Sequence, residues 1–202
     1  MKTDDSDCAR SLRSRDAIAL RQLMLHEPHI ALLTDFVQKL RETHPAWEFP
    51  DFDPLDGGCN ADILFLFEKP GPKTSARGKG SGFISRNNDD PTAEATFGFM
   101  NKAGLPRKRT VIWNVIPGWN GTRKVTRKEL RAGVDFLKGL FPLLPKLRTI
   151  VLVGQKAQQA TSLVEPLHLW VLSSAHPSPL VRAKHPHVWN AIPLTWALAR
   201  EY

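Results

Sequence analysis

Four short and almost uninterrupted apolar runs constrain the fold of this chain more than any other feature. They cover residues 61–67, 110–114, 148–153 and 169–173. A strand needs such a run when both of its faces are buried, as in a parallel sheet that is covered on two sides. Segments with helical spacing separate the runs. We therefore predict an α/β fold, a three-layer α/β/α sandwich around a central four-stranded parallel sheet.

Local signals fix the helices between these runs. A helix is predicted from Pro91 to Ala103, ended by Gly104. Thr126 and Glu129 have the spacing of a capping box, which predicts a helix through about Leu140. A further helix is expected to begin at residues 154–155. An amphipathic helix over residues 186–201 closes the fold, and Pro193 can kink it.

The first 58 residues differ from the rest and are predicted to form a helical cap and a loop. Two peripheral helices are expected within the first 45 residues, the second beginning at Pro28, because proline suits a first helical turn. Residues 45–58 are rich in aspartate and proline and predict a loop. A length of 202 residues fits one domain over 1–202, with the α/β core in 59–202.

Composition narrows the class of protein. No run approaches the roughly 18 apolar residues that span a membrane, and the N-terminus lacks the apolar segment of a signal peptide. Cys8 and Cys59 are the only cysteines, so we expect no disulfide framework and no metal site. We expect a monomer, since the sequence has no heptad pattern of the kind that forms a coiled coil with a partner. The small number of cysteines fits the reducing cytoplasm.

Charge is segregated along the chain. The net charge is +8, yet residues 104–148 hold 11 Lys and Arg against 2 Asp and Glu. Residues 69–86 add 5 basic residues and no acid, whereas residues 51–68 hold 5 acids and no base. Clustered positive charge favours a polyanion such as DNA, because neutralising phosphates releases counterions. Simple solvation of exposed lysines and arginines is the alternative.

Polar residues stand where three of the predicted strands end. Glu68 follows the first run, Asn114 ends the second, and His176 follows the last. Pro177 and Pro179 stiffen the loop that carries His176, because each fixes its own φ and removes a backbone donor. Ligands bind beyond the carboxyl ends of strands in such sheets. The three side chains are therefore expected to share a site.

Five motifs in order along the chain resemble those of the uracil-DNA glycosylase superfamily. They are Phe67-Glu68-Lys69-Pro70-Gly71, Ser81-Gly82-Phe83-Ile84, Trp113-Asn114-Val115-Ile116-Pro117, Leu152-Val153-Gly154-Gln155-Lys156-Ala157 and His176-Pro177-Ser178-Pro179-Leu180. The last is the most specific and the first is weak alone. The resemblance covers about residues 60–200. It implies a cofactor-independent enzyme that cleaves the N-glycosidic bond of uracil in DNA.

The resemblance also implies a role for each motif residue. His176 would stabilise the departing uracil anion by donating to its O2. The amide of Asn114 would read uracil through N3–H and O4, which cytosine cannot match. Phe83 would stack on the flipped base, while Glu68 and Gly71 would line the base site. The non-functional alternatives are that His176 is a solvated histidine, Asn114 caps a strand end and Phe83 packs in the core.

The first motif departs from the best-known branch of the superfamily. That branch places a water-positioning aspartate directly before the motif proline, where this chain has Lys69. An ammonium is no general base at neutral pH without a large pKa shift. Glu68, one residue earlier, resembles a second branch that carries four cysteines for an iron–sulfur cluster, which this chain lacks. Glu68 either orders the water, contacts the base or pairs with a nearby lysine.

A set of residues around these motifs is predicted to contact DNA. It consists of Lys69, Lys73, Arg123, Ser178, Leu180, Val181 and Arg182. Leu180 or Val181 can wedge into the base stack that a flipped nucleotide vacates, and Arg182 can hold a phosphate. The alternative is a partly buried loop after His176.

The sequence thus predicts a DNA repair glycosylase that leaves an abasic site and releases free uracil. Its partner would be DNA that contains uracil or another deaminated base. Two alternatives stay open: a glycosylase for other deaminated or modified bases, and a module that binds lesions but has lost catalysis because of Lys69.

Overall fold

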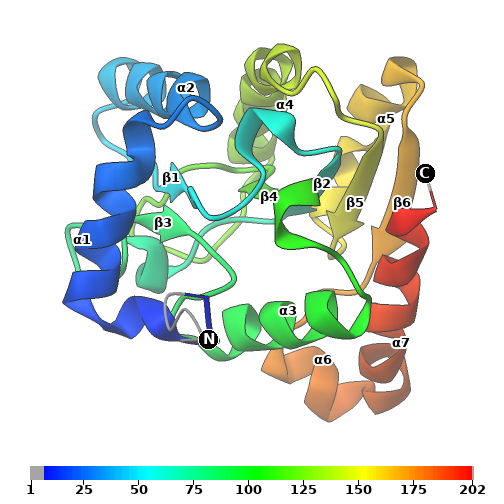
Figure 1. The fold of residues 1–202 in the computed structure, drawn as a ribbon. Helices are drawn as coiled ribbons and strands as arrows, with labels where there is room; N and C mark the ends of the chain where they lie inside the picture. The colour runs from blue at the N-terminus through cyan, green and yellow to red at the C-terminus, as the bar shows by residue number, and fades with distance from the viewer. Residues whose placement is uncertain (1–6, 202) are drawn as a thin grey trace.

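A four-stranded parallel sheet forms the centre of the molecule, in a computed structural model that describes residues 7–201 (Figure 1). Its strand order is β4-β2-β5-β6. The strands are β2 (Ile63–Phe67), β4 (Thr110–Asn114), β5 (Thr149–Val153) and β6 (Trp170–Ser174). All residues of β2, β4 and β5 are buried, as their continuous apolar runs require. The predicted parallel sheet is confirmed.

Helices cover both faces of this sheet, which confirms the three-layer α/β/α architecture. Figure 1 shows α2, α4 and α5 on one side and α3, α6 and α7 on the other. The helices are α1 (Arg15–Leu23), α2 (Ala31–Thr43), α3 (Pro91–Lys102), α4 (Arg127–Leu140), α5 (Thr161–Val164), α6 (Pro179–Lys184) and α7 (Pro186–Ala197). The capping box of Thr126 and Glu129 opens α4 as predicted. Pro193 lies inside α7.

The strand register aligns the carboxyl ends in one row. Phe67 of β2 lies beside Asn114 of β4, and Val153 of β5 lies beside Ser174 of β6. Residues that follow these positions therefore leave the sheet at the same edge. The connection that leaves β2 passes over one face of the sheet. Those that leave its neighbours, β4 and β5, pass over the other face (Figure 1). Such a reversal opens a crevice for ligands at the strand ends.

Two expectations for the last third of the chain are wrong. β6 is not a buried strand: in the described part of the chain it pairs with β5 alone, at the sheet edge, and Trp170 is 54% exposed. The segment after β5 does not form one helix. It begins with a turn at Gly154, whose φ is 95°, and continues as a 3₁₀ turn at Ala157–Ala160 and the short α5.

The N-terminal segment is part of the core rather than peripheral. α2 begins at Ala31, three residues after Pro28, and buries Leu33 and Val37 completely. The expected loop over 45–58 contains β1 (Asp51–Phe52), which pairs in parallel with β3 (Phe83–Ile84). Phe52 then stacks on Trp113 of β4 at a ring separation of 3.8 Å. These contacts fasten the first 58 residues to the central sheet.

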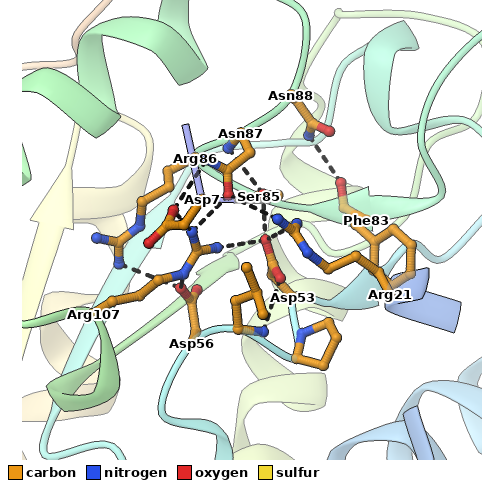
Figure 2. A network of polar contacts seen from close by, with 12 residues as sticks. Asp7, Arg21, Asp53, Asp56, Phe83, Ser85, Arg86, Asn87, Asn88 and Arg107 are labelled. Carbon is orange, nitrogen blue, oxygen red and sulfur yellow. Dashed lines mark hydrogen bonds and ion pairs between the residues drawn. The ribbon is translucent and has the colours of Figure 1, made fainter. Parts of the chain in front are cut away.

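A buried ionic cluster joins the N-terminal segment to the loop after β3 (Figure 2). Its centre is Asp53, whose carboxylate accepts hydrogen bonds from Arg21 of α1 at 2.8 Å, from Arg107 at 2.7 Å and from the hydroxyl of Ser85. Arg107 also forms an ion pair with Asp56 at 2.9 Å. The side chains of Asp53 and Asp56 are 0% and 1% exposed. Charges this deep are stable only as a complete set.

Replacing Asp53 should therefore destabilise the protein strongly. Asp53→Asn keeps the shape but leaves Arg21 and Arg107 without their shared counter-charge, so we expect a loss of about 3–5 kcal/mol in the free energy of unfolding. The exposed carboxylate of Asp135, which pairs with Lys138 on α4, provides a control. Asp135→Asn should cost no more than about 0.5 kcal/mol. Urea unfolding followed by circular dichroism tests both, and equal losses would contradict the role of Asp53.

Candidate active site

A cavity of about 400 Å³ lies at the carboxyl edge of the sheet. It brings together three residues predicted for the base site, namely Asn114, His176 and Gly71. Its apolar lining comes from Phe67, Ile84, Ala93 and Ile112, together with Pro70, Pro72, Pro91 and Pro179. Its remaining lining residues are polar or charged: Lys73, Thr74, Ser85, Arg86, Asn88, Asp90, Thr92, Thr96 and Arg123. The cavity can thus enclose a flat apolar ring and meet it with a few polar groups.

Asn114 lines this cavity and has an unsatisfied acceptor. The residue ends β4 and is 4% exposed. Its Oδ1 atom is buried and finds no hydrogen-bond partner among the described residues. A buried polar atom without a partner costs about 1–3 kcal/mol. A ligand with an N–H donor at this place would remove that cost.

The backbone around His176 is held by several hydrogen bonds. The N–H of Gly154 donates to the carbonyl of Ser174 at 2.9 Å, and the N–H of Ser178 donates to the carbonyl of His176 at 2.8 Å. Trp196 donates through its indole nitrogen to the Ser174 hydroxyl at 2.8 Å. The rings of Phe67 and His176 pack edge to face, with their centroids 5.7 Å apart. The imidazole thus has a fixed place at the cavity.

The electrostatics of His176 favour its neutral form. Burial lowers the pKa of His176 from its ordinary value, and the carboxylates of Glu68 and Asp90 oppose this shift only in part. Within residues 7–201 neither ring nitrogen forms a hydrogen bond. A neutral imidazole with a free N–H can donate to a developing anion.

Glu68 is turned away from the cavity. Its Oε1 accepts a hydrogen bond from the backbone N–H of Lys156 at 3.0 Å. The carboxylate lies over Gly154, where an added Cβ would come within 2.6 Å of Oε1. Glu68 is not among the residues that line the cavity. Its charge reaches His176, but its position does not fit the predicted contact with base or water.

Lys69 is a structural anchor, which corrects its prediction as a DNA contact. Its ammonium donates to Asn120 Oδ1 at 2.8 Å, to the Lys124 carbonyl at 2.9 Å and to Glu129 Oε1 at 2.7 Å. All three donors are used, and the side chain is only 4% exposed. The ammonium also lies over the Trp47 ring at 5.9 Å. The ammonium therefore has no donor left to bind a phosphate.

Glu129 completes this anchor from the first turn of α4. Burial disfavours its charge, but hydrogen bonds from Lys69 and from Thr126 outweigh that effect and lower the pKa of the carboxyl. Its two oxygens accept from Lys69, from Asn120 at 2.7 Å and from the Thr126 N–H at 2.7 Å. The pair joins the end of β2 to the loop before α4.

Phe83 does not line the cavity, so the predicted base-stacking role does not fit its position. Its side chain is 1% exposed and faces a second pocket beside Trp47 and Phe49. Neighbouring residues of a strand point to opposite sides, and Ile84 is the one that faces the candidate site. The phenyl ring in the cavity lining is that of Phe67, to which the sequence analysis gave no stacking role.

Asp90 was missed at the sequence level. It lines the cavity, and among residues 7–201 it is the only carboxylate that does so. It is also the N-cap of α3, since its Oδ1 accepts from the N–H groups of Thr92 and Ala93. No motif could have revealed it, because only the fold brings the start of α3 beside His176.

The predicted DNA contacts fall into two groups. Lys73 and Arg123 line the cavity, and both are exposed. The segment after His176 is the short helix α6 rather than a loop, and the hydroxyl of Ser178 caps it by accepting from the Val181 N–H at 3.3 Å. Leu180 is 61% exposed on this helix.

The remaining two residues of this group lie on α6 as well. Val181 is half-buried, and Arg182 is exposed. The guanidinium of Arg182 lies over the Trp189 ring at 5.8 Å. Of the two wedge candidates, Leu180 is therefore more exposed than Val181. The charge of Arg182 lies at the surface.

The model of the uracil DNA glycosylase superfamily matches residues 55–194, which include the whole cavity lining. The chain belongs to this superfamily. Membership supports a uracil glycosylase type of function on DNA. No curated protein matches the chain. None of the helices within residues 7–201 has the length and apolar character needed to cross a bilayer.

Similar solved structures carry related names. A putative uracil DNA glycosylase from Methanosarcina acetivorans is 18% identical with a TM-score of 0.47, covering 70% of this chain and 92% of its own. The UNG of Nitratifractor salsuginis is 13% identical with a TM-score of 0.45, covering 89% and 97%. A mimivirus UNG in complex with UGI is 15% identical with a TM-score of 0.42, covering 87% and 75%.

The protonation of His176 can be measured directly. Because its pKa is lowered in the folded protein, its NMR signals should titrate below about 6.5, the value of an unperturbed histidine. The unfolded chain binds this proton more readily, so the contribution of His176 to stability declines as the pH falls through about 6.5. The same signals in urea-unfolded protein are the reference. A folded midpoint at or above that reference would contradict the neutral form.

Proposed function

We propose that the protein excises uracil from DNA by hydrolysing the bond between N1 of the base and C1′ of the sugar. The observation that carries this proposal is the buried, unpartnered Oδ1 of Asn114 in the same cavity as His176. A buried acceptor of this kind would be satisfied by the N–H group of a heterocyclic ring. Uracil offers one at N3, between two carbonyls.

Base choice follows from the amide of Asn114. Its Oδ1 accepts from N3–H of uracil while its NH₂ donates to O4. Cytosine presents an acceptor at N3 and a donor at C4, so both contacts would be lost and Oδ1 would stay unsatisfied. Loss of such a buried pairing can discriminate strongly between bases. The base reaches the cavity by leaving the stack, at a cost of a few kcal/mol.

The chemistry uses the neutral ring of His176. As the N1–C1′ bond breaks, its electron pair leaves with uracil and spreads to O2, while positive charge grows on the sugar. His176 donates a hydrogen bond to O2 and so stabilises the departing anion. A water oxygen bonds to C1′ and gives up a proton. The products are an abasic site and free uracil.

The surface around the cavity suits DNA. Lys73 and Arg123 stand at its lining, and Arg127, Lys128 and Arg131 are exposed on α4. Leu180 projects from α6 and is the candidate wedge for the vacated stack. In this proposal the protein acts as a monomer in a reducing compartment that contains DNA.

Excision from a lesion panel tests the proposal. Oligonucleotides with uracil, hypoxanthine, xanthine, thymine or cytosine are incubated with the protein, and alkali reveals abasic sites. We expect uracil to rank first. His176→Ala should lower the single-turnover rate about 10²–10³-fold, because one donor to the developing anion is lost. Asn114→Asp should lower uracil excision and re-rank the bases, whereas Asn101→Asp on the exposed end of α3 should not.

Three outcomes would contradict the proposal. Full activity in His176→Ala and Asn114→Asp would remove both residues from the site. A different base at the top of the ranking would assign the enzyme to another deaminated or modified base. Lesion binding without abasic product would indicate a binding module.

The salt dependence of DNA binding separates Lys69 from the true phosphate contacts. Arg123→Ala should reduce the slope of log K against log salt by about 1 and leave the melting temperature unchanged. Lys69→Met should leave that slope unchanged but lower the melting temperature, because Glu129 loses its buried partner. Fluorescence anisotropy and thermal unfolding provide the two readouts. A change of slope in Lys69→Met would restore Lys69 as a DNA contact.

A further inference from the structure

We propose that Asp90, the N-cap of α3, orients the water that attacks the sugar. This inference rests on the proposed function and names the group that completes it. In the first motif, Lys69 occupies the position where the resemblance leads us to expect the acid that orients the attacking water. Asp90 lies on a different element, more than twenty positions later in the chain, and reaches the same cavity.

The hydrogen bonds of Asp90 leave one oxygen available. Its Oδ1 accepts from the N–H of Thr92 at 2.9 Å and from the N–H of Ala93 at 3.0 Å. These two bonds fix the carboxylate at the start of α3. Within the described part of the chain its Oδ2 accepts no hydrogen bond. A fixed carboxylate with one free oxygen can hold a water in a defined direction.

Competing acids near the strand ends are already committed elsewhere. Glu68 is held by the N–H of Lys156 and lies outside the lining. Glu129 is bound to Lys69 and to the start of α4. Asp89 pairs with Arg10 at 3.1 Å and with Lys73 at 3.5 Å, and it does not line the cavity.

The charges of the cavity match the charges of the reaction. Asp90 is close enough to His176 for its charge to act on that ring. His176 would face the anion that forms on the base, whereas the carboxylate of Asp90 would face the cation that forms on the sugar. The water on Oδ2 bonds to C1′ as the N1–C1′ bond breaks. Its proton passes to the Asp90 carboxylate and then to solvent.

Neutralising Asp90 without disturbing the fold gives a direct test. Asn is as good an N-cap as Asp, so Asp90→Asn should keep the melting temperature and bind DNA with 2′-fluoro-2′-deoxyuridine, which resists cleavage, within about twofold of the original affinity. The single-turnover rate on uracil DNA should fall at least about 10²-fold. Asp89→Asn removes a neighbouring carboxylate of equal charge outside the cavity and should stay within threefold.

A second variant separates loss of a carboxylate from other damage. Asp90→Ser retains a capping hydroxyl and leaves room for a small anion. Added sodium formate should raise its excision rate several-fold, and should not raise the rate of Asp89→Ser. The absence of this rescue would count against a carboxylate at the water.

The outcomes also separate this inference from the proposed function. If the unaltered protein excises uracil and His176→Ala lowers that activity as expected, the proposed function stands. Under those conditions an Asp90→Asn rate within threefold of the original, or an equal loss in Asp89→Asn, overturns the role of Asp90 alone. If the unaltered protein leaves no abasic site in any oligonucleotide, both proposals fall together.

Discussion

The buried ionic cluster around Asp53 is the interaction on which the rest of the structure depends. It joins α1, the loop after β1 and the loop after β3, three segments that are far apart in the chain (Figure 2). The loop held by Ser85 and Asn87 leads directly into Asp90 and α3. One wall of the cavity is therefore positioned by charges that lie behind it. The N-terminal segment acts as a support for the site, because it supplies Arg21 and Asp53.

A second anchor is the ion pair of Lys69 with Glu129. It fixes the end of β2 against the loop that precedes α4, where Arg123 reaches the cavity. The two anchors differ in kind from the apolar core, since each requires every partner to be present. Between them, the strand register places Asn114, and hydrogen bonds beyond the end of β6 hold the backbone around His176.

Sequence reasoning found the sheet and the strand-end residues because these depend on local patterns. Continuous apolar runs predicted β2, β4 and β5, and strand ends predicted Asn114 and His176. It failed for side chains whose direction is set by tertiary contacts. Phe83 and Ile84 are adjacent and equally apolar, and only the pairing of β3 with β1 decides which one faces the cavity. The partners of Lys69 lie about 50–60 residues away, so no local pattern could reveal that it is buried.

In the proposed mechanism, the acid for catalysis lies on a different element from the first motif. A water-orienting carboxylate needs a fixed place in the cavity, and its sequence position is irrelevant. A helix N-cap meets this need well, because backbone N–H groups hold one oxygen and the partial positive charge of the helix start favours a carboxylate there. Once Asp90 occupies that place, the position before Pro70 is free to carry a cation. Lys69 and Glu129 then give this position a structural role, which couples the loop before α4 to the end of β2.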